Sequence, residues 1–227
     1  MLPYVVYSAA FFGYAVAEWL RSLARIPYNP ILYTFVAVAV MTFSVYRLLA
    51  LRQRVRNLEL GRDGERTVAE ILDQLKARGC AVFHDILGAD FNIDHVVIAP
   101  QGVYAVETKT IRKPPGAEIS YKGDELVAGS LVIGKAPLVQ AEAEARWLAS
   151  ILESVLTTRY EVKPVLLFVG WFVQPMPRSM KDRAWVLNPK ALPSFIENEP
   201  VSLSIEDMKS IVFHLATYAR VRAGRTA

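Results

Sequence analysis

Three charged side chains interrupt a stretch of sequence that otherwise predicts two buried β-strands. Residues 91–109 form two apolar segments joined by a turn at Pro100-Gln101, and they contain Asp94, Glu107 and Lys109. A buried strand tolerates charged side chains only where other groups pair with them. A metal ion and a phosphate group are such partners, so the pattern indicates chemistry on phosphodiesters.

The turn between the two strands predicts which residues face one another. A turn centred on Pro100-Gln101 places Val96 opposite Ala105. In the same register Asp94 faces Glu107, with Cβ atoms roughly 4.5–5.5 Å apart. Two carboxylates at that distance repel, and a divalent cation such as Mg²⁺ or Mn²⁺ removes the conflict. Lys109 shares the face of Glu107 because side chains alternate along a strand, so it can hold an attacking water or a phosphate oxygen.

The motifs around this segment resemble those of a known family. A carboxylate followed by Glu-x-Lys is the pattern of the PD-(D/E)xK nucleases, and the wider set resembles the nuclease-related domain called NERD. In chain order the matching motifs are Gly61–Glu65, Ile93–Ile98, Gly102–Lys109 and Pro137–Gln140, and the resemblance covers roughly residues 58–170. Two positions depart from the family pattern, since Ala136 stands where many members have Asn and Asn92 where an acidic residue is common.

The resemblance implies a fold, a reaction and a role for each site residue. The implied fold is the restriction-endonuclease-like α/β fold, a mixed sheet flanked by helices. The implied reaction is metal-dependent cleavage of nucleic acid with Mg²⁺ or Mn²⁺. Asp94 and Glu107 would hold the metal, and Glu65 would be a further ligand or would orient bound water. Lys109 would orient or activate water, and Gln140 would position substrate or water.

Helical spacing brings Glu65 and Gln140 to the same region. Val68 and Leu72 belong to the apolar stripe of an amphipathic helix, and Glu65 lies about one turn before Val68. In a later helix Gln140 falls on the inward face that Leu148 continues. An amide in that position can donate and accept hydrogen bonds at the site.

The histidines show no catalytic pattern. His95 lies on the opposite strand face from Asp94, so we expect a packed histidine rather than a catalytic base. His84 and His214 have no partner that the sequence reveals. No cluster of cysteine and histidine indicates a zinc site.

The N-terminal quarter has the composition of a membrane anchor. Two stretches, about residues 2–20 and 26–47, are nearly free of charge, and two prolines with Asn29 separate them. A spanning helix needs about 20 apolar residues. The second stretch therefore predicts a membrane span, and the first predicts either a second span, which would make a helical hairpin, or an interfacial helix. We expect residues 1–56 to be the anchor and residues 57–227 to be the nuclease-related domain.

The arginines around these stretches predict their orientation. Four arginines follow the second stretch and two lie in the short loop before it, which favours a cytoplasmic C-terminal side. A signal peptide is the rival interpretation of residues 1–20, but no Lys or Arg precedes the apolar stretch as such a peptide requires. The expected location is therefore the inner or plasma membrane, with the domain facing the cytoplasm.

Charge and cysteine content bound the class of the second part. Residues 1–56 hold six Arg and one Glu, a net charge of +5, whereas residues 57–227 hold 20 basic and 21 acidic groups, a net charge of −1. The pI near 9.2 therefore comes from the flank of the anchor and gives no argument for DNA binding. The second part is long enough for one domain core. A single cysteine, Cys80, excludes an internal disulfide and fits a reducing compartment.

The order of elements after residue 57 predicts a mixed sheet flanked by helices. We expect a helix, three strands, a hairpin, a helix, two strands and a final helix. The more specific predictions are hairpin strands over 117–121 and 126–133, strands over 164–173 and 185–187, and a helix from its cap Ser204 to about Tyr218.

The leading hypothesis from the sequence is a membrane-anchored, Mg²⁺-dependent nuclease that acts on DNA, rather than RNA, in the cytoplasm. An alternative is a membrane-tethered module that binds nucleic acid or a partner protein without cutting. A third hypothesis, a membrane assembly or transport component, ranks last because the spans carry charged groups only at their ends, at Glu18 and Arg47. The sequence leaves the oligomeric state open, a homo-oligomer included.

Overall fold

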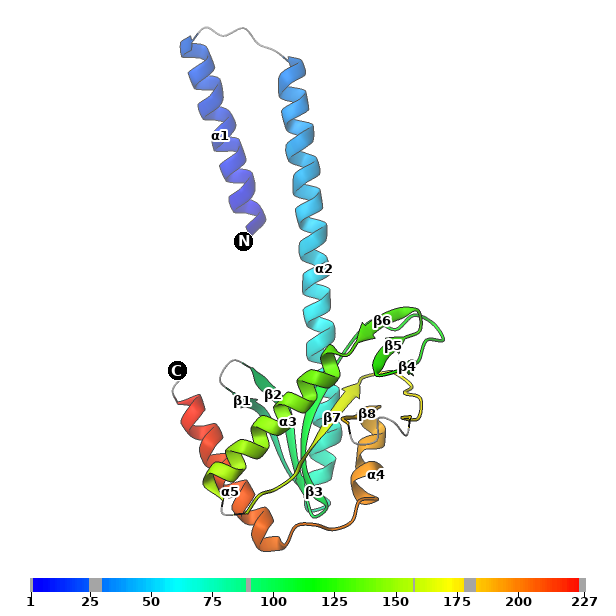
Figure 1. Ribbon diagram of the computed structural model, residues 1–227. Coiled ribbons are helices and arrows are strands. Elements are labelled where there is room, and N and C mark those ends of the chain that lie inside the picture. Colours follow the sequence, from blue (N-terminus) through cyan, green and yellow to red (C-terminus); the bar gives the residue numbers. More distant parts are fainter. Residues whose placement is uncertain (1, 25–29, 89–90, 157, 178–182, 225–227) are drawn as a thin grey trace. The chain divides into compact units, whose positions relative to one another are not determined.

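The computed structural model describes residues 2–24, 30–88, 91–156, 158–177 and 183–224, and its elements are drawn in Figure 1. The chain divides into two compact units, Met1–Val55 and Arg56–Ala227. Helix α1 (Leu2–Ala24) and the first part of helix α2 (Pro30–Lys76) belong to the first unit. The strands belong to the second unit, so the site residues predicted on strands lie there.

One segment of α2 is long and apolar enough to cross a membrane. It runs from Thr34 to Val55 over 22 residues, and its side chains are exposed, Phe35 and Phe43 among them. A signal sequence near an N-terminus meets the same criteria of length and composition, so the segment is one candidate span. Among the described helices α1 does not meet these criteria. The predicted break between two spans falls on residues 25–29, which lie outside the described residues.

The second unit is built on a five-stranded mixed sheet. Its strands are β1 (Ala81–Leu87), β2 (Asn92–Ala99), β3 (Gly102–Lys109), β7 (Val162–Phe168) and β8 (Trp185–Leu187), and their order is β1-β2-β3-β7-β8. The first three strands pair antiparallel, and β3, β7 and β8 pair parallel. Val96 pairs with Ala105, which confirms the predicted register of β2 and β3.

Helices cover both faces of this sheet, as predicted (Figure 1). Side chains alternate between the two faces along each strand. On one face Val96 and Ala105 pack in a core with Leu148 of helix α3 (Ala136–Val155), and helix α5 (Ile205–Ala223) joins the same core. On the other face Tyr104 packs in a second core with Leu72 of α2. The strands therefore carry one set of side chains toward α3 and the other toward α2.

A smaller antiparallel sheet precedes α3. It contains β4 (Ile119–Lys122), β5 (Glu125–Ala128) and β6 (Leu131–Gly134) in that order. The single strand predicted over 126–133 is wrong, because the chain reverses between β5 and β6. Gly129 makes the reversal with a φ of +61°, a conformation that glycine adopts without steric cost.

The C-terminal elements follow the prediction in part. Strand β7 ends before Gly170, whose φ is +78°, and so is shorter than the predicted 164–173. Strand β8 confirms the strand predicted at 185–187. The short helices η2 (Pro189–Ala191) and α4 (Leu192–Glu197) were not predicted. Ser204 and Asp207 form the predicted capping box, and α5 then continues past Tyr218.

Candidate active site

The ends of β2 and β3 and the start of α3 bring polar side chains to one face of the sheet. Asp94 lies near the start of β2, Glu107 and Lys109 close β3, and Gln140 lies early in α3. Side chains alternate along each strand, so Asp94 shares a face with Val96, and Glu107 and Lys109 share a face with Ala105. Val96 and Ala105 pack toward α3. The structure thus brings together four of the five site residues that the sequence predicts.

Gln140 connects the two charged residues of β3. Its Oε1 accepts a hydrogen bond of 2.9 Å from Lys109 Nζ, and its Nε2 donates one of 2.8 Å to Glu107 Oε1. Lys109 Nζ also forms an ion pair with Glu107 Oε1. Glu107 is only 4% exposed. Because burial of a carboxyl group costs free energy unless other groups pair with it, these two side chains offset part of that cost.

Asp94 lies beside this group, bonded to the backbone of β3. The pairing of β2 with β3 extends to His95 and Val106, one position short of the predicted Asp94–Glu107 pair. Asp94 Oδ2 instead accepts a hydrogen bond of 2.7 Å from the backbone N–H of Thr108. Burial and, after it, the charge of Glu107 raise the pKa of Asp94, the Thr108 N–H opposes them, and the net pKa is about 7. The two carboxylates therefore repel, and a proton or a cation is favoured between them.

Glu65 reaches the edge of the site from α2. Its side chain is exposed, and its charge contributes to the raised pKa of Asp94. The neighbouring Gly64 allows the helix to approach the end of β3. A Cβ at position 64 would lie 1.8 Å from Thr110 Oγ1 and 2.9 Å from Thr110 Cβ. The glycine of this motif therefore has a packing role, and Glu65 lies near the site but outside its hydrogen-bond network among the described residues.

The donor set fits a divalent cation, with the protein supplying two ligands. Asp94 and Glu107 offer carboxylate oxygens, and Glu107 Oε2 is buried without a hydrogen-bond partner among the described residues. In the same part of the chain, no group of three or more His, Cys, Asp or Glu side chains is arranged to hold a metal ion. Mg²⁺ usually takes one or two protein carboxylates and completes its shell with water and phosphate oxygens. Asp94 and Glu107 would be the two carboxylates of such a site, whereas the predicted third ligand, Glu65, is not grouped with them.

The sequence did not predict one further buried carboxyl group at the site. Glu144 lies one turn after Gln140 on α3, is 2% exposed, and accepts a hydrogen bond of 2.8 Å from Gln140 Nε2. Burial and, after it, the charge of Glu107 raise the pKa of Glu144 to about 8. Its position one turn before Leu148, on the apolar stripe of the helix, is the signal that could have found it.

His95 is packed, as predicted, on the α2 side of the sheet. Its Nδ1 lies 2.9 Å from Nδ1 of His84, and the residue is 4% exposed. Burial lowers the pKa of His95 to about 4, so the ring is neutral near pH 7. A neutral ring that faces away from Asp94 does not serve the carboxylate site.

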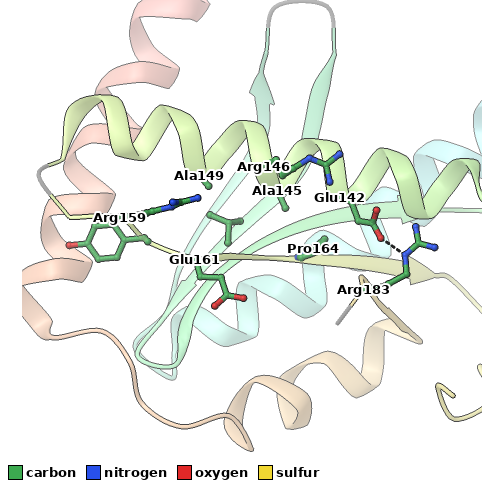
Figure 2. A pocket seen from close by; sticks show the side chains of 10 residues that line it. Glu142, Ala145, Arg146, Ala149, Arg159, Glu161, Pro164 and Arg183 are labelled. Atoms are coloured by element: carbon green, nitrogen blue, oxygen red, sulfur yellow. Dashed lines mark hydrogen bonds and ion pairs between the residues drawn. The ribbon is translucent and has the colours of Figure 1, made fainter. Parts of the chain in front are cut away.

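A separate groove of about 750 Å³ lies between α3 and the segment that leads into β7 (Figure 2). Its lining combines small apolar side chains such as Ala145 with charged ones. In it Arg183 Nε donates a hydrogen bond of 2.6 Å to Glu142 Oε1. None of the five predicted site residues lines this groove, so it is distinct from the carboxylate site.

Comparison with known proteins bears on the whole region. No curated protein and no solved structure matches the chain. Residues 60–169 match the family model of the nuclease-related domain, NERD, which confirms the resemblance predicted over roughly 58–170. The matched range contains all five predicted site residues, so the second unit is similar to the nuclease-related domain over the whole candidate site.

Proposed function

We propose that the chain is a membrane-anchored, metal-dependent nuclease that hydrolyses phosphodiester bonds in DNA. The observation that carries the proposal is the convergence of Asp94, Glu107, Lys109 and Gln140 on one face of the sheet, inside the range that matches the nuclease-related domain. The match itself supports a nuclease-like function, and the four side chains supply the chemistry that such a function needs.

Lys109 is the residue that would act on the phosphate. Its ammonium group carries only hydrogen-bond donors, and 28% of its side chain is exposed, so it can reach a phosphate oxygen or an attacking water. A positive charge in that place stabilises the negative charge that develops on the phosphate in the transition state. Gln140 would hold the ammonium group in place through its side-chain oxygen.

Asp94 and Glu107 would hold Mg²⁺ or Mn²⁺. Burial and repulsion by Glu107 raise the pKa of Asp94, and this supports the role, because a cation favours the ionised form of a carboxyl group. When bound, such a cation would lower the pKa of a coordinated water and neutralise charge on the phosphate. Glu65 would orient water at the edge of the site, since its charge contributes to the raised pKa of Asp94.

The anchor would be residues 1–56, with the nuclease-related domain on the cytoplasmic side of the inner or plasma membrane. The apolar segment Thr34–Val55 and the arginines that follow the apolar stretch support this topology. Alkaline extraction of membranes from cells that express the full chain tests it. The anchored protein stays in the membrane pellet, whereas a protein released into the supernatant would refute the anchor.

Cleavage of labelled DNA by the full chain in detergent micelles tests the nuclease. The reaction is run with Mg²⁺, with Mn²⁺ and with EDTA, on single- and double-stranded DNA and on RNA. Asp94→Asn removes the carboxylate charge with little change of shape, and Asp124→Asn, at an exposed aspartate paired with Lys135, is the matched control. We expect metal-dependent cleavage of DNA that Asp94→Asn lowers by roughly 100-fold or more and Asp124→Asn leaves unchanged. Equal activity of wild type and Asp94→Asn would refute the assignment.

A tethered module that binds nucleic acid or a protein without cutting is the second candidate. One observation favours it, namely that the described residues contain no assembled group of three metal ligands. This candidate predicts a folded chain that does not cut DNA, whether or not it binds DNA, and that shows no Mn²⁺ binding in a calorimetric titration. Binding that survives Asp94→Asn while cleavage is lost would instead support the nuclease.

A further inference from the structure

Glu144 has no role in the reaction proposed above, yet it is buried beside the residues that do. It is 2% exposed, and its Oε1 accepts a hydrogen bond from Gln140 Nε2. Its Oε2 is buried and makes no hydrogen bond within the described residues. Burial of a carboxyl group costs free energy unless hydrogen bonds compensate for the loss of water. The group that it contacts by hydrogen bond is the amide of Gln140.

The partners of Gln140 determine which way its amide points. The Lys109 ammonium group can only donate, so it requires the amide oxygen. The amide nitrogen carries two hydrogens, and the oxygens of Glu107 and Glu144 accept them at 2.8 Å each. A reversed amide would set its oxygen against two carboxyl groups and its nitrogen against an ammonium group. Three contacts therefore favour a single orientation, and Glu144 supplies one of them.

We propose that Glu144 is a positioning residue: it holds the Gln140 amide with the nitrogen toward Glu107 and the oxygen toward Lys109, and so fixes the Lys109 ammonium group. The inference rests on the nuclease function proposed above. Glu144 acts through Gln140 and does not itself contact the phosphate. Without it one N–H of the amide loses its acceptor, and the long side chain of Gln140 gains rotamer freedom.

The charge state of Glu144 suggests how to substitute it. Burial, with the charge of Glu107, raises the pKa of Glu144 to about 8, so the neutral acid predominates near pH 7 in the metal-free chain. A proton on Oε2 leaves Oε1 as the acceptor for Gln140. Glu144→Gln therefore keeps both the neutral state and an acceptor oxygen. Glu144→Met keeps a similar volume and removes the acceptor, which makes the two variants a matched pair.

Steady-state cleavage of a labelled DNA oligonucleotide by the full chain with Mg²⁺ tests the proposal. We expect Glu144→Met to lower kcat about tenfold, the effect of one lost hydrogen bond, with KM unchanged. We expect Glu144→Gln to stay within about threefold of wild type because the acceptor is retained. Equal losses in both variants, or no loss in either, would overturn the proposal.

A double substitution separates positioning from packing. If Glu144 acts through Gln140, Glu144→Met has no further effect on kcat in a chain that already carries Gln140→Ala. A purely structural role for Glu144 predicts the same loss in both backgrounds. An equal loss in the two backgrounds would therefore refute the positioning role.

A spectroscopic readout keeps the test valid if the chain does not cut DNA. The sequence has five glutamines, so a chain labelled with side-chain [¹⁵N]glutamine gives few amide signals, and Gln140→Ala identifies the signal of Gln140. We expect Glu144→Met to shift and broaden that signal and Glu144→Gln to preserve it. A Gln140 signal unchanged by Glu144→Met would overturn the positioning role. A shifted signal without DNA cleavage would support the role and refute the nuclease function.

Discussion

Substitution of Gly64 by alanine probes the contact that brings α2 to the end of β3. The added Cβ would lie 1.8 Å from Thr110 Oγ1, 3.1 Å from Thr110 Cγ2 and 2.9 Å from Thr110 Cβ. Rotation of the threonine side chain can move the first two atoms. It cannot move Cβ, so the helix or the strand must shift. The contact lies next to Glu65, and its loss would also move that residue.

Two opposed effects determine the size of the change. Overpacking of a well-packed contact costs about 1–3 kcal/mol. Alanine in a helix interior gains up to about 1 kcal/mol over glycine. The net expectation for Gly64→Ala is a loss of about 1–2 kcal/mol in the free energy of unfolding. For a domain of this size such a loss lowers Tm by roughly 2–8 °C.

Gly61 provides the matched control on the same helix. A Cβ at Gly61 meets nothing within 4 Å, so Gly61→Ala should raise Tm by a few degrees or leave it unchanged. Thermal unfolding of the full chain in detergent micelles, followed by tryptophan fluorescence, measures both. Thr110→Ala in the Gly64→Ala background should recover part of the loss, because it removes Oγ1 and Cγ2. A Gly64→Ala chain as stable as Gly61→Ala would refute the close approach of α2 to β3.

Two further predictions concern stability. The pKa values of Asp94 and Glu144 are raised from 3.8 and 4.5 to about 7 and about 8, so the folded chain retains protons that the unfolded chain has lost. The free energy of unfolding of the metal-free chain should therefore fall as pH rises from about 4 to about 8. Glu144→Gln should flatten the upper part of that fall. A urea midpoint that rises over this range would contradict the burial of these carboxyl groups. Ser204→Ala removes the side-chain cap of α5 and should lower the free energy of unfolding by about 1 kcal/mol. Urea unfolding measures the loss, with Ser210→Ala in the same helix as the control. Equal midpoints for the two variants would show that the capping box contributes nothing.

The charged strand pair could be predicted from the sequence because strand geometry leaves little freedom. A period of two along each strand and one tight turn determine the register, and the Val96–Ala105 pair confirms it. The same alternation places Asp94, Glu107 and Lys109 toward α3. Helical spacing adds Gln140, since it lies on the inward face of its helix.

Tertiary contacts explain what the sequence did not reveal. Glu144 lies on the apolar stripe of its helix, but its hydrogen bond with Gln140 becomes visible only in the folded chain. Residues 126–133 are mostly apolar, as in a single strand, and the positive φ of Gly129 divides them into two strands. Asp94 accepts its hydrogen bond from a backbone N–H of β3, and the pattern of side chains in the sequence does not predict such a bond.

The central claim is that Lys109 acts on the phosphate beside two metal-binding carboxylates. Cleavage of labelled DNA by Lys109→Met at saturating Mg²⁺ tests it most directly. Lys113→Met is the matched control, since Lys113 is exposed and hydrogen-bonds the backbone oxygen of Gly170 instead of the site. We predict that Lys109→Met lowers the cleavage rate by roughly 100-fold or more with DNA binding retained, and that Lys113→Met stays within about threefold of wild type. A Lys109→Met chain that cuts DNA at the wild-type rate would contradict the claim.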